Sequence, residues 1–118
     1  HDALPIFVED IAAVVQAAAP YPVKVIIETC LLTDEEKRIA CGLVARGGAA
    51  YVKTSTGFNS GGATEHDVRL LAEEAAKYGL KVKAAGGIRN LADAQNMLSA
   101  GADRIGTSAG AAIAAEEA

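Results

Sequence analysis

Short apolar runs alternate along the chain with longer stretches in which apolar residues recur every three to four positions. In Ile6–Ala19 the apolar residues have a spacing near 3.6, which predicts an amphipathic helix, and Pro20 ends it. Val23–Thr29 is a β-branched run that is apolar on both faces at its middle, as is typical of a buried parallel strand. The chain is therefore predicted to begin with a helix and then a strand.

The order of strand and helix then recurs along the whole chain. Thr33 followed by Glu36 is a capping-box signature, and it opens a helix that stops at Gly47 and Gly48. The later elements are strands at Ala50–Thr56, Lys81–Ala85 and Arg104–Thr107, and helices from Thr64 to Gly79, from Asn90 through Leu98, and in the Ala-rich stretch to Ala114. Four strand–helix units in series predict a wholly parallel sheet with right-handed crossovers.

The length of 118 residues allows a single domain, residues 1–118. Eight strand–helix units of a closed barrel use about 250 residues, so four units are half of such a barrel. We expect an open α/β sheet, a sheet that pairs with another copy, or a part of something longer. His1, with no initiator Met before it, mildly favours the last.

Charge and composition exclude several classes of function. The 11 Lys and Arg against 15 Asp and Glu are scattered and give a net charge of -4, so nucleic acid and anionic membranes are not expected partners. No apolar run approaches the roughly 18 residues of a membrane span, which predicts a soluble, cytoplasmic protein. Cys30 and Cys41 lack metal-ligand spacing and are expected to be small core residues, with a Cys30 thiol that reacts with aldehydes as the alternative. His66 is expected to be solvated, with a catalytic base as the alternative. A zinc site is therefore not expected.

Two lysines lie in the middle of predicted strands, where a charge must be paired, desolvated or functional. Lys53 and Lys83 are separated by about one strand–helix repeat, so on neighbouring strands their amines would face each other. A second ammonium nearby lowers the pKa of a lysine and raises its nucleophilic fraction, which is what Schiff-base chemistry needs. Either lysine alone is more often a snorkelling or salt-bridged residue. Lys24, on the first strand, suits a proton network or an ion pair at the rim equally well.

Glycine-rich loops follow the last two predicted strands. Gly86-Gly87-Ile88-Arg89 comes after the third strand, and Gly106-Thr107-Ser108-Ala109-Gly110 comes after the fourth. Glycines let backbone N–H groups approach an anion, and a helix N-terminus adds partial positive charge. Together the loops predict a phosphate cradle, with ordinary strand-to-helix turns as the alternative. A further loop, Phe58–Gly62, either folds over a ligand or is merely a flexible connection.

Four strings of the sequence closely resemble deoxyribose-phosphate aldolase. They are Val23-Lys24-Val25-Ile26-Ile27-Glu28-Thr29-Cys30, Val52-Lys53-Thr54-Ser55-Thr56-Gly57-Phe58, Lys83-Ala84-Ala85-Gly86-Gly87-Ile88-Arg89 and Arg104-Ile105-Gly106-Thr107-Ser108. The second string is the most specific. The resemblance spans nearly the whole chain and corresponds to the C-terminal half of the family's eightfold barrel. It implies an α/β fold, the (βα)4 half of a TIM barrel preceded by one helix.

The resemblance also implies an activity and a set of site residues. The family, an aldehyde-lyase, reversibly cleaves 2-deoxy-D-ribose 5-phosphate into D-glyceraldehyde 3-phosphate and acetaldehyde without a cofactor. Lys53 would form the Schiff base, Lys83 would lower its pKa, and Lys24 would match a lysine of the proton relay. The positions that match the phosphate side of the family's site are Gly57, Gly86, Gly87, Arg89, Gly106 and Ser108.

Two departures from the family's pattern affect these expectations. The family's catalytic aspartate belongs to the N-terminal half of the barrel, so no residue here is assigned as general acid or base. Ala109 stands where the family often has a second serine, which removes one hydroxyl donor. The first hypothesis is therefore a lyase that needs the other half-barrel, from a longer chain or a partner. The alternatives are a catalytically silent half-barrel that self-associates with a second copy, and another phosphosugar-binding barrel.

Overall fold

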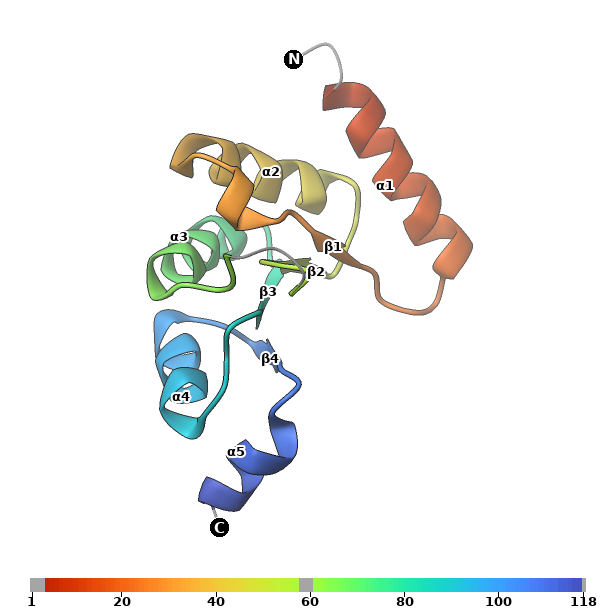
Figure 1. Cartoon of the computed structure of the whole chain (residues 1–118). Helices are drawn as coiled ribbons and strands as arrows, with labels where there is room; N and C mark the ends of the chain where they lie inside the picture. The colour runs from red at the N-terminus through yellow and green to blue at the C-terminus, as the bar shows by residue number, and fades with distance from the viewer. Residues whose placement is uncertain (1–3, 58–60, 118) are drawn as a thin grey trace.

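The computed structural model describes residues 4–57 and 61–117, and it contains four strands and five α-helices in alternation (Figure 1). The first helix precedes the first strand, and every strand is followed by a helix, as the sequence predicts. The elements in chain order are α1 (Leu4–Ala18), β1 (Lys24–Ile26), a 3-10 turn η1 (Thr29–Leu31), α2 (Asp34–Arg46), β2 (Tyr51–Lys53), α3 (Glu65–Ala76), β3 (Lys81–Ala85), α4 (Leu91–Ala100), β4 (Arg104–Gly106) and α5 (Gly110–Glu117).

Helix starts follow the capping residues that the sequence shows. Thr33 and Glu36 form the expected capping box before α2, with each side chain accepting from the other residue's backbone N–H. Thr64 accepts from Asp67 N (3.1 Å) before α3, and Asn90 accepts from Asp93 N (2.8 Å) before α4. The predicted helices are confirmed, with ends that differ by a few residues.

The four strands form one parallel sheet in the order β1-β2-β3-β4. The first two strands are shorter than predicted. β1 ends at Ile26 because Glu28 takes a left-handed conformation (φ 52°) and Thr29 begins η1. Sheet-like bonding nevertheless continues past the strand ends, since Thr29 N donates to Thr54 O (2.8 Å) and Thr54 N donates to Lys83 O (3.1 Å). The fold class is the one that the sequence predicts.

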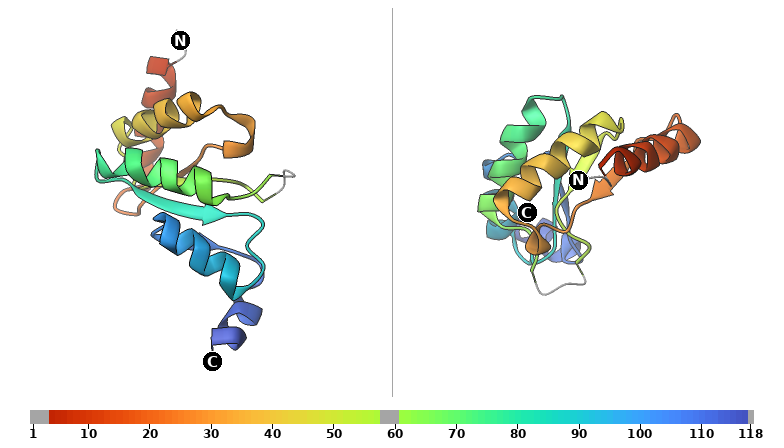
Figure 2. Two further views of the ribbon diagram at one scale, coloured as in Figure 1. Left: turned by 90° about the vertical axis from the view of Figure 1, so that its left-hand side faces the viewer. Right: turned by 90° about the horizontal axis from the view of Figure 1, so that it is seen from above.

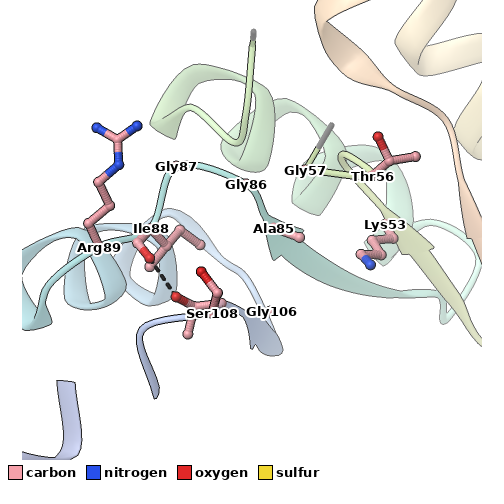
Figure 3. A pocket seen from close by; sticks show the side chains of 11 residues that line it. Lys53, Thr56, Gly57, Ala85, Gly86, Gly87, Ile88, Arg89, Gly106 and Ser108 are labelled. Carbon is pink, nitrogen blue, oxygen red and sulfur yellow. Dashed lines mark hydrogen bonds between the residues drawn. The ribbon is translucent and has the colours of Figure 1, made fainter. Parts of the chain in front are cut away.

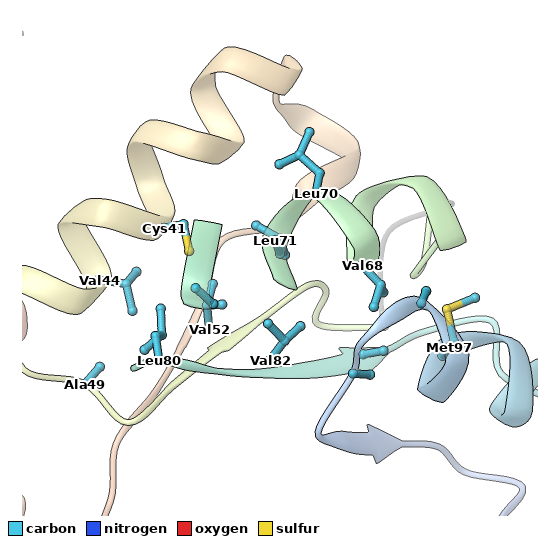
Figure 4. Packing of buried hydrophobic residues seen from close by; sticks show 14 of the residues in the cluster. Cys41, Val44, Ala49, Val52, Val68, Leu70, Leu71, Leu80, Val82 and Met97 are labelled. Atoms are coloured by element: carbon cyan, nitrogen blue, oxygen red, sulfur yellow. The ribbon is translucent and has the colours of Figure 1, made fainter. Parts of the chain in front are cut away.

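The core lies between the sheet and helices α2, α3 and α4 (Figure 4). Val52 and Val82 point from the strands into this layer, where Val44 and Leu71 meet them from the helices; all four are almost completely buried. Helix α1 packs against α2, where Gly47 and Gly48 leave room for its side chains, and projects away from the sheet (Figure 2). Helices α2, α3 and α4 therefore cover one face of the sheet.

The other face of the sheet is open, which corrects one prediction. The sequence predicts that the first strand is buried on both faces, but Lys24 is exposed and Ile26 is 43% exposed. β1 lies at the edge of the sheet, and within the described residues only the face of Val25 and Ile27 packs against the core. No helix in the described part of the chain is long and apolar enough to cross a membrane.

Candidate active site at the carboxyl edge of the sheet

A cavity of about 470 Å³ lies at the carboxyl ends of β2, β3 and β4 (Figure 3). This is the edge at which parallel α/β folds bind their ligands. The residues that line the cavity are Lys53, Thr56, Gly57, Ala85, Gly86, Gly87, Ile88, Arg89, Gly106, Thr107 and Ser108. They include Lys53 and all six residues predicted for the phosphate side.

Lys53 and Lys83 lie side by side on the open face of the sheet. β2 and β3 are neighbours and pair Lys53 with Lys83 in register, so the two side chains leave the sheet on the same side. Lys53 lines the cavity, whereas Lys83 is not among the lining residues. The Lys83 side chain instead packs on Gly106, because a Cβ there would lie 3.0 Å from Lys83 Cε and 3.8 Å from Nζ. The sequence predicts the pair but not this difference in access.

The surroundings of Lys83 favour its neutral form. Burial, followed by the positive charges of Lys24, Lys53 and Arg104, lowers the pKa of the Lys83 ammonium below its usual value. Lys83 therefore releases its proton more readily than an ordinary lysine.

Lys24 lies one layer away from the cavity, at the amino ends of the strands. Its Nζ is 5.4 Å from the centre of the Tyr51 ring, which is also faced by Lys81 (5.8 Å) and Arg104 (5.1 Å). Lys24 is not among the residues that line the cavity. The structure thus brings its charge near Lys83 but places its side chain over an aromatic ring.

The glycine turn after β3 forms one wall of the cavity. Gly86 (φ 88°) and Gly87 (φ 75°) both adopt left-handed conformations that suit glycine. A Cβ on Gly62 would lie 2.3 Å from Gly86 O, so this close approach of two backbones requires glycine. Ala63 N donates to both Ala85 O (3.1 Å) and Gly86 O (3.0 Å). Residues 58–60 of the predicted loop lie outside the described residues.

The loop after β4 is tied to the loop after β3. Thr107 Oγ1 donates to Ile88 O (2.5 Å) and accepts from Ala109 N (3.0 Å), so both loops share one hydroxyl. Figure 3 shows Lys53 and Arg89 at opposite ends of the cavity lining. The sequence predicts no role for the side chains of four further lining residues, although each is adjacent to a predicted residue: Thr56, Ala85, Ile88 and Thr107.

Glu28 holds Thr56 in the cavity wall. The Glu28 carboxylate accepts from Thr56 N (3.2 Å) and from Thr56 Oγ1 (2.7 Å). Glu28 is the positive-φ residue at the end of β1, and strained backbone of this kind is common at functional sites. No sequence pattern indicates this contact, because the two residues are 28 positions apart.

An acidic cluster with one histidine lies away from the cavity, at the starts of α2 and α3. Ligand atoms of Asp34, His66 and Asp67 lie within 4.8 Å of one another. Lys37 Nζ already contacts Asp67 (2.6 Å) and Asp34 (3.2 Å), so an ammonium occupies the position between these carboxylates. His66 is exposed, as predicted, and its Nε2 lies 2.9 Å from Asp34 Oδ2. The cluster is a network that joins the two helices.

The two cysteines differ from each other. Cys41 is completely buried, as predicted, and burial followed by the Glu74 charge raises the pKa of its thiol to about 11. The prediction that Cys30 is a core residue is wrong, because Cys30 is exposed. It lies on η1, which turns the chain out of the sheet, and its Cβ occupies the space beside Gly61.

The fold and the cavity define a class of protein. Four parallel strand–helix units, with a lysine and glycine-rich turns at the carboxyl edge, have the arrangement of half an α/β barrel.

Comparison with known proteins finds relatives that the chain matches over part of their length. The chain is 60% identical over 104 residues to deoxyribose-phosphate aldolase of Streptococcus pneumoniae, a match that covers 88% of this chain and 47% of the relative. It is 58% identical over 106 residues to deoxyribose-phosphate aldolase of Dictyoglomus turgidum, with 90% and 48% covered. No protein-family model matches. The predicted resemblance to deoxyribose-phosphate aldolase is confirmed.

Solved structures agree with the sequence relatives. A structure described as the aldolase QR15 superposes with a TM-score of 0.93 at 43% identity, covering 98% of this chain and 52% of that one. A tetrameric deoxyribose phosphate aldolase from Aeropyrum pernix superposes with a TM-score of 0.87 at 38% identity, covering 93% and 48%. The chain thus spans about half the length of the relatives that it matches, and it has the fold of half of such an aldolase.

Proposed function

We propose that this chain carries the Schiff-base and phosphate-binding half of an aldolase site that cleaves 2-deoxy-D-ribose 5-phosphate. The observation that supports the proposal most directly is the position of Lys53, which lines one cavity together with the glycine turns after β3 and β4. The identity of the substrate is inferred from the relatives described above, which are deoxyribose-phosphate aldolases. Full activity requires the other half of the barrel.

The proposed reaction begins at Lys53. Its neutral amine attacks the aldehyde carbon C1 of the open-chain sugar, and loss of water leaves a protonated imine. A base removes the proton of the C3 hydroxyl, the C2–C3 bond breaks, and its electron pair moves into the iminium to give an enamine. The C3 fragment leaves as D-glyceraldehyde 3-phosphate. Protonation of the enamine at C2 and hydrolysis of the imine then release acetaldehyde and free Lys53.

The other residues of the proposed site act on charge and position. Lys83, whose pKa is lowered, is proposed to exchange protons with the reacting amine, and its register with Lys53 on the neighbouring strand supports this role. Backbone N–H groups of the turns at Gly86, Gly87 and Gly106 face the phosphate, and Arg89 adds positive charge at the far end of the cavity. Lys24 contributes its charge from the adjacent layer.

Substitution of Lys53 tests the proposal. Lys53→Ala is expected to abolish imine formation with acetaldehyde, while inorganic phosphate still shifts the amide signals of Gly86 and Gly87 in NMR spectra. The matched control is Lys81→Ala, on the same face of the sheet and outside the cavity lining, which should leave imine formation unchanged. Imine formation that survives in Lys53→Ala would contradict the proposal.

The open sheet face supports a second candidate. A half-barrel that covers this face with a second copy would be a folding unit without activity, and a deoxyribose phosphate aldolase relative is tetrameric. The two candidates differ in the chemistry of Lys53, since the silent unit forms no selective imine there. A third candidate is another phosphosugar-binding barrel, which would bind phosphate and form no imine at Lys53.

A further inference from the structure

One buried hydroxyl joins the strand of Lys53 to the glycine turn across the cavity. Thr54, directly after Lys53, is completely buried and is not among the lining residues. Its Oγ1 donates to Ala85 O (3.1 Å) and accepts from Ala85 N (3.1 Å). Both backbone groups of Ala85 are therefore held by one side chain.

The hydrogen-bonding capacity of this hydroxyl is fully used. Besides the two bonds to Ala85, Thr54 Oγ1 accepts from Ser55 Oγ (3.1 Å), and Ser55 is also completely buried. A hydroxyl has one donor and two acceptor positions, so all three are occupied. A buried group satisfied in this way has one preferred orientation, and losing it would leave the Ala85 groups without this partner.

The hydrogen bonds of Thr54 reach both the strand positions of the lysine pair and the glycine turn after β3. Its backbone N–H donates to Lys83 O (3.1 Å), which continues the register of Lys53 and Lys83 past the end of β2. Its side chain holds Ala85, the residue immediately before Gly86 and Gly87 in the cavity wall. Gly86 packs closely here, since a Cβ on it would lie 3.4 Å from Ser55 Cβ.

We propose that Thr54 is a positioning residue that sets the distance between the Lys53 amine and the phosphate-binding turn. This inference rests on the proposed function, and it adds a residue that acts through Lys53 and Gly86 without touching the substrate. A small displacement between two groups that bind one substrate reduces the rate at which the substrate reacts. The effect of Thr54 should thus appear as a loss of preference for a phosphorylated substrate.

The test measures this phosphate preference in the full chain. Cyanoborohydride traps the Lys53 imine formed with 2-deoxyribose 5-phosphate or with 2-deoxyribose, and the preference is the ratio of the two rates. Thr54→Val replaces the hydroxyl with a methyl group of similar size and is expected to lower the ratio about tenfold. Thr54→Ser keeps the hydroxyl and should stay within about twofold of the wild type. Circular dichroism establishes that each variant is folded.

Three results would overturn the proposal. The first is a ratio in Thr54→Val within about twofold of the wild type. The second is an equal loss in Thr54→Ser. The third is a fall of both rates by the same factor, which would show a purely structural role. If Thr54→Val does not fold, Thr54→Ala gives the same comparison with a smaller side chain and the same expected and contradicting results.

A second readout separates this inference from the proposed function. If the wild type forms no Lys53 adduct with either sugar, the Schiff-base proposal fails. Binding of inorganic phosphate, followed by the amide signals of Gly86 and Gly87, then tests Thr54 alone. Affinity about tenfold weaker in Thr54→Val than in the wild type would support the positioning role, whereas equal affinity, or no phosphate binding in the wild type, would overturn it.

Discussion

Lys83 is partly buried and lies near three other positive charges. Its pKa is lowered by burial first and then by three neighbouring cations, while the pKa of Lys37 and that of Lys77 are raised. Folding therefore makes it harder for Lys83 to keep its proton, at a cost to stability that depends on pH.

The sign of this dependence follows from proton counting. An unfolded lysine titrates near 10.4. Between the lowered pKa of folded Lys83 and that value, the unfolded chain holds a proton that the folded chain has released, so the Lys83 contribution to the free energy of unfolding rises with pH. Below the folded pKa, both states are protonated and the full cost is present.

Lys83→Met is therefore expected to raise the free energy of unfolding at pH 7, and the gain should shrink toward pH 10.5. Urea unfolding of wild type and variant at several pH values measures it. Lys77→Met is the matched control, because Glu74 raises the pKa of the exposed Lys77 and its substitution should lower stability or leave it unchanged. A Lys83→Met gain that does not vary with pH would be inconsistent with this account.

Some residues of the site were predictable and others were not. The glycine-rich turns and the mid-strand Lys53 leave local patterns in the sequence, whereas Gly57 is predicted only from the resemblance to deoxyribose-phosphate aldolase. The contact of Glu28 with Thr56, and the access of Lys53 but not Lys83 to the cavity, depend on tertiary packing. The prediction that Cys30 is a core residue is wrong because an apolar string gives no sign that the chain turns outward at η1.

At the scale of elements, helices α2 and α3 are joined by a buried ion pair. Lys37 Nζ lies 2.6 Å from Asp67 Oδ1, and the two side chains are 9% and 8% exposed. Asp34 also contacts Lys37 (3.2 Å) from the first turn of α2. Burial opposes the charge of Lys37, but the two carboxylates outweigh it and raise its pKa.

Breaking this ion pair should lower the free energy of unfolding. Lys37→Met leaves the buried Asp67 carboxylate without its ammonium partner and is expected to cost about 3 kcal/mol in the free energy of unfolding. The double variant Lys37→Met/Asp67→Leu should recover most of that loss, because an apolar pair leaves no uncompensated charge. Chemical denaturation gives both values. A double variant as unstable as the single one would contradict the ion-pair explanation.

Element boundaries show what local sequence can specify. The caps at Thr33, Thr64 and Asn90 were readable because each acts on a backbone group three residues away. β1 and β2 are shorter than predicted although hydrogen bonds continue past their ends, and the left-handed Glu28 that stops β1 leaves no local pattern in the sequence. The exposure of Ile26 follows from the open face of the sheet, which no local pattern reports.

At the scale of the whole molecule, positive charge gathers on the open face of the sheet although the chain has a net charge of -4. Strand register places five cations on this face, and three of them surround the Tyr51 ring. They are Lys24, Lys53, Lys81, Lys83 and Arg104. In a symmetric pair of two copies the same patch would face itself, so these charges would repel.

Self-association through this face should therefore depend on salt. We expect the chain to associate more strongly at 0.5 M than at 0.02 M NaCl, because salt screens repulsion between the two faces. Sedimentation velocity at both concentrations measures it. Lys81→Glu should strengthen association at low salt, and Arg69→Glu on α3 makes the same charge change outside the sheet face. Association that weakens with salt, or responds equally to both variants, would rule out pairing through this face.

We propose that Lys53 is the amine that reacts in the cavity, and borohydride trapping followed by peptide mass spectrometry tests this assignment. The chain is incubated with acetaldehyde or 2-deoxyribose 5-phosphate, reduced, digested, and the modified lysine is located. We predict a single reduced adduct on Lys53, because it lines the cavity and Lys83 does not. An adduct on Lys83, labelling spread over all lysines, or no adduct would contradict the assignment of Lys53.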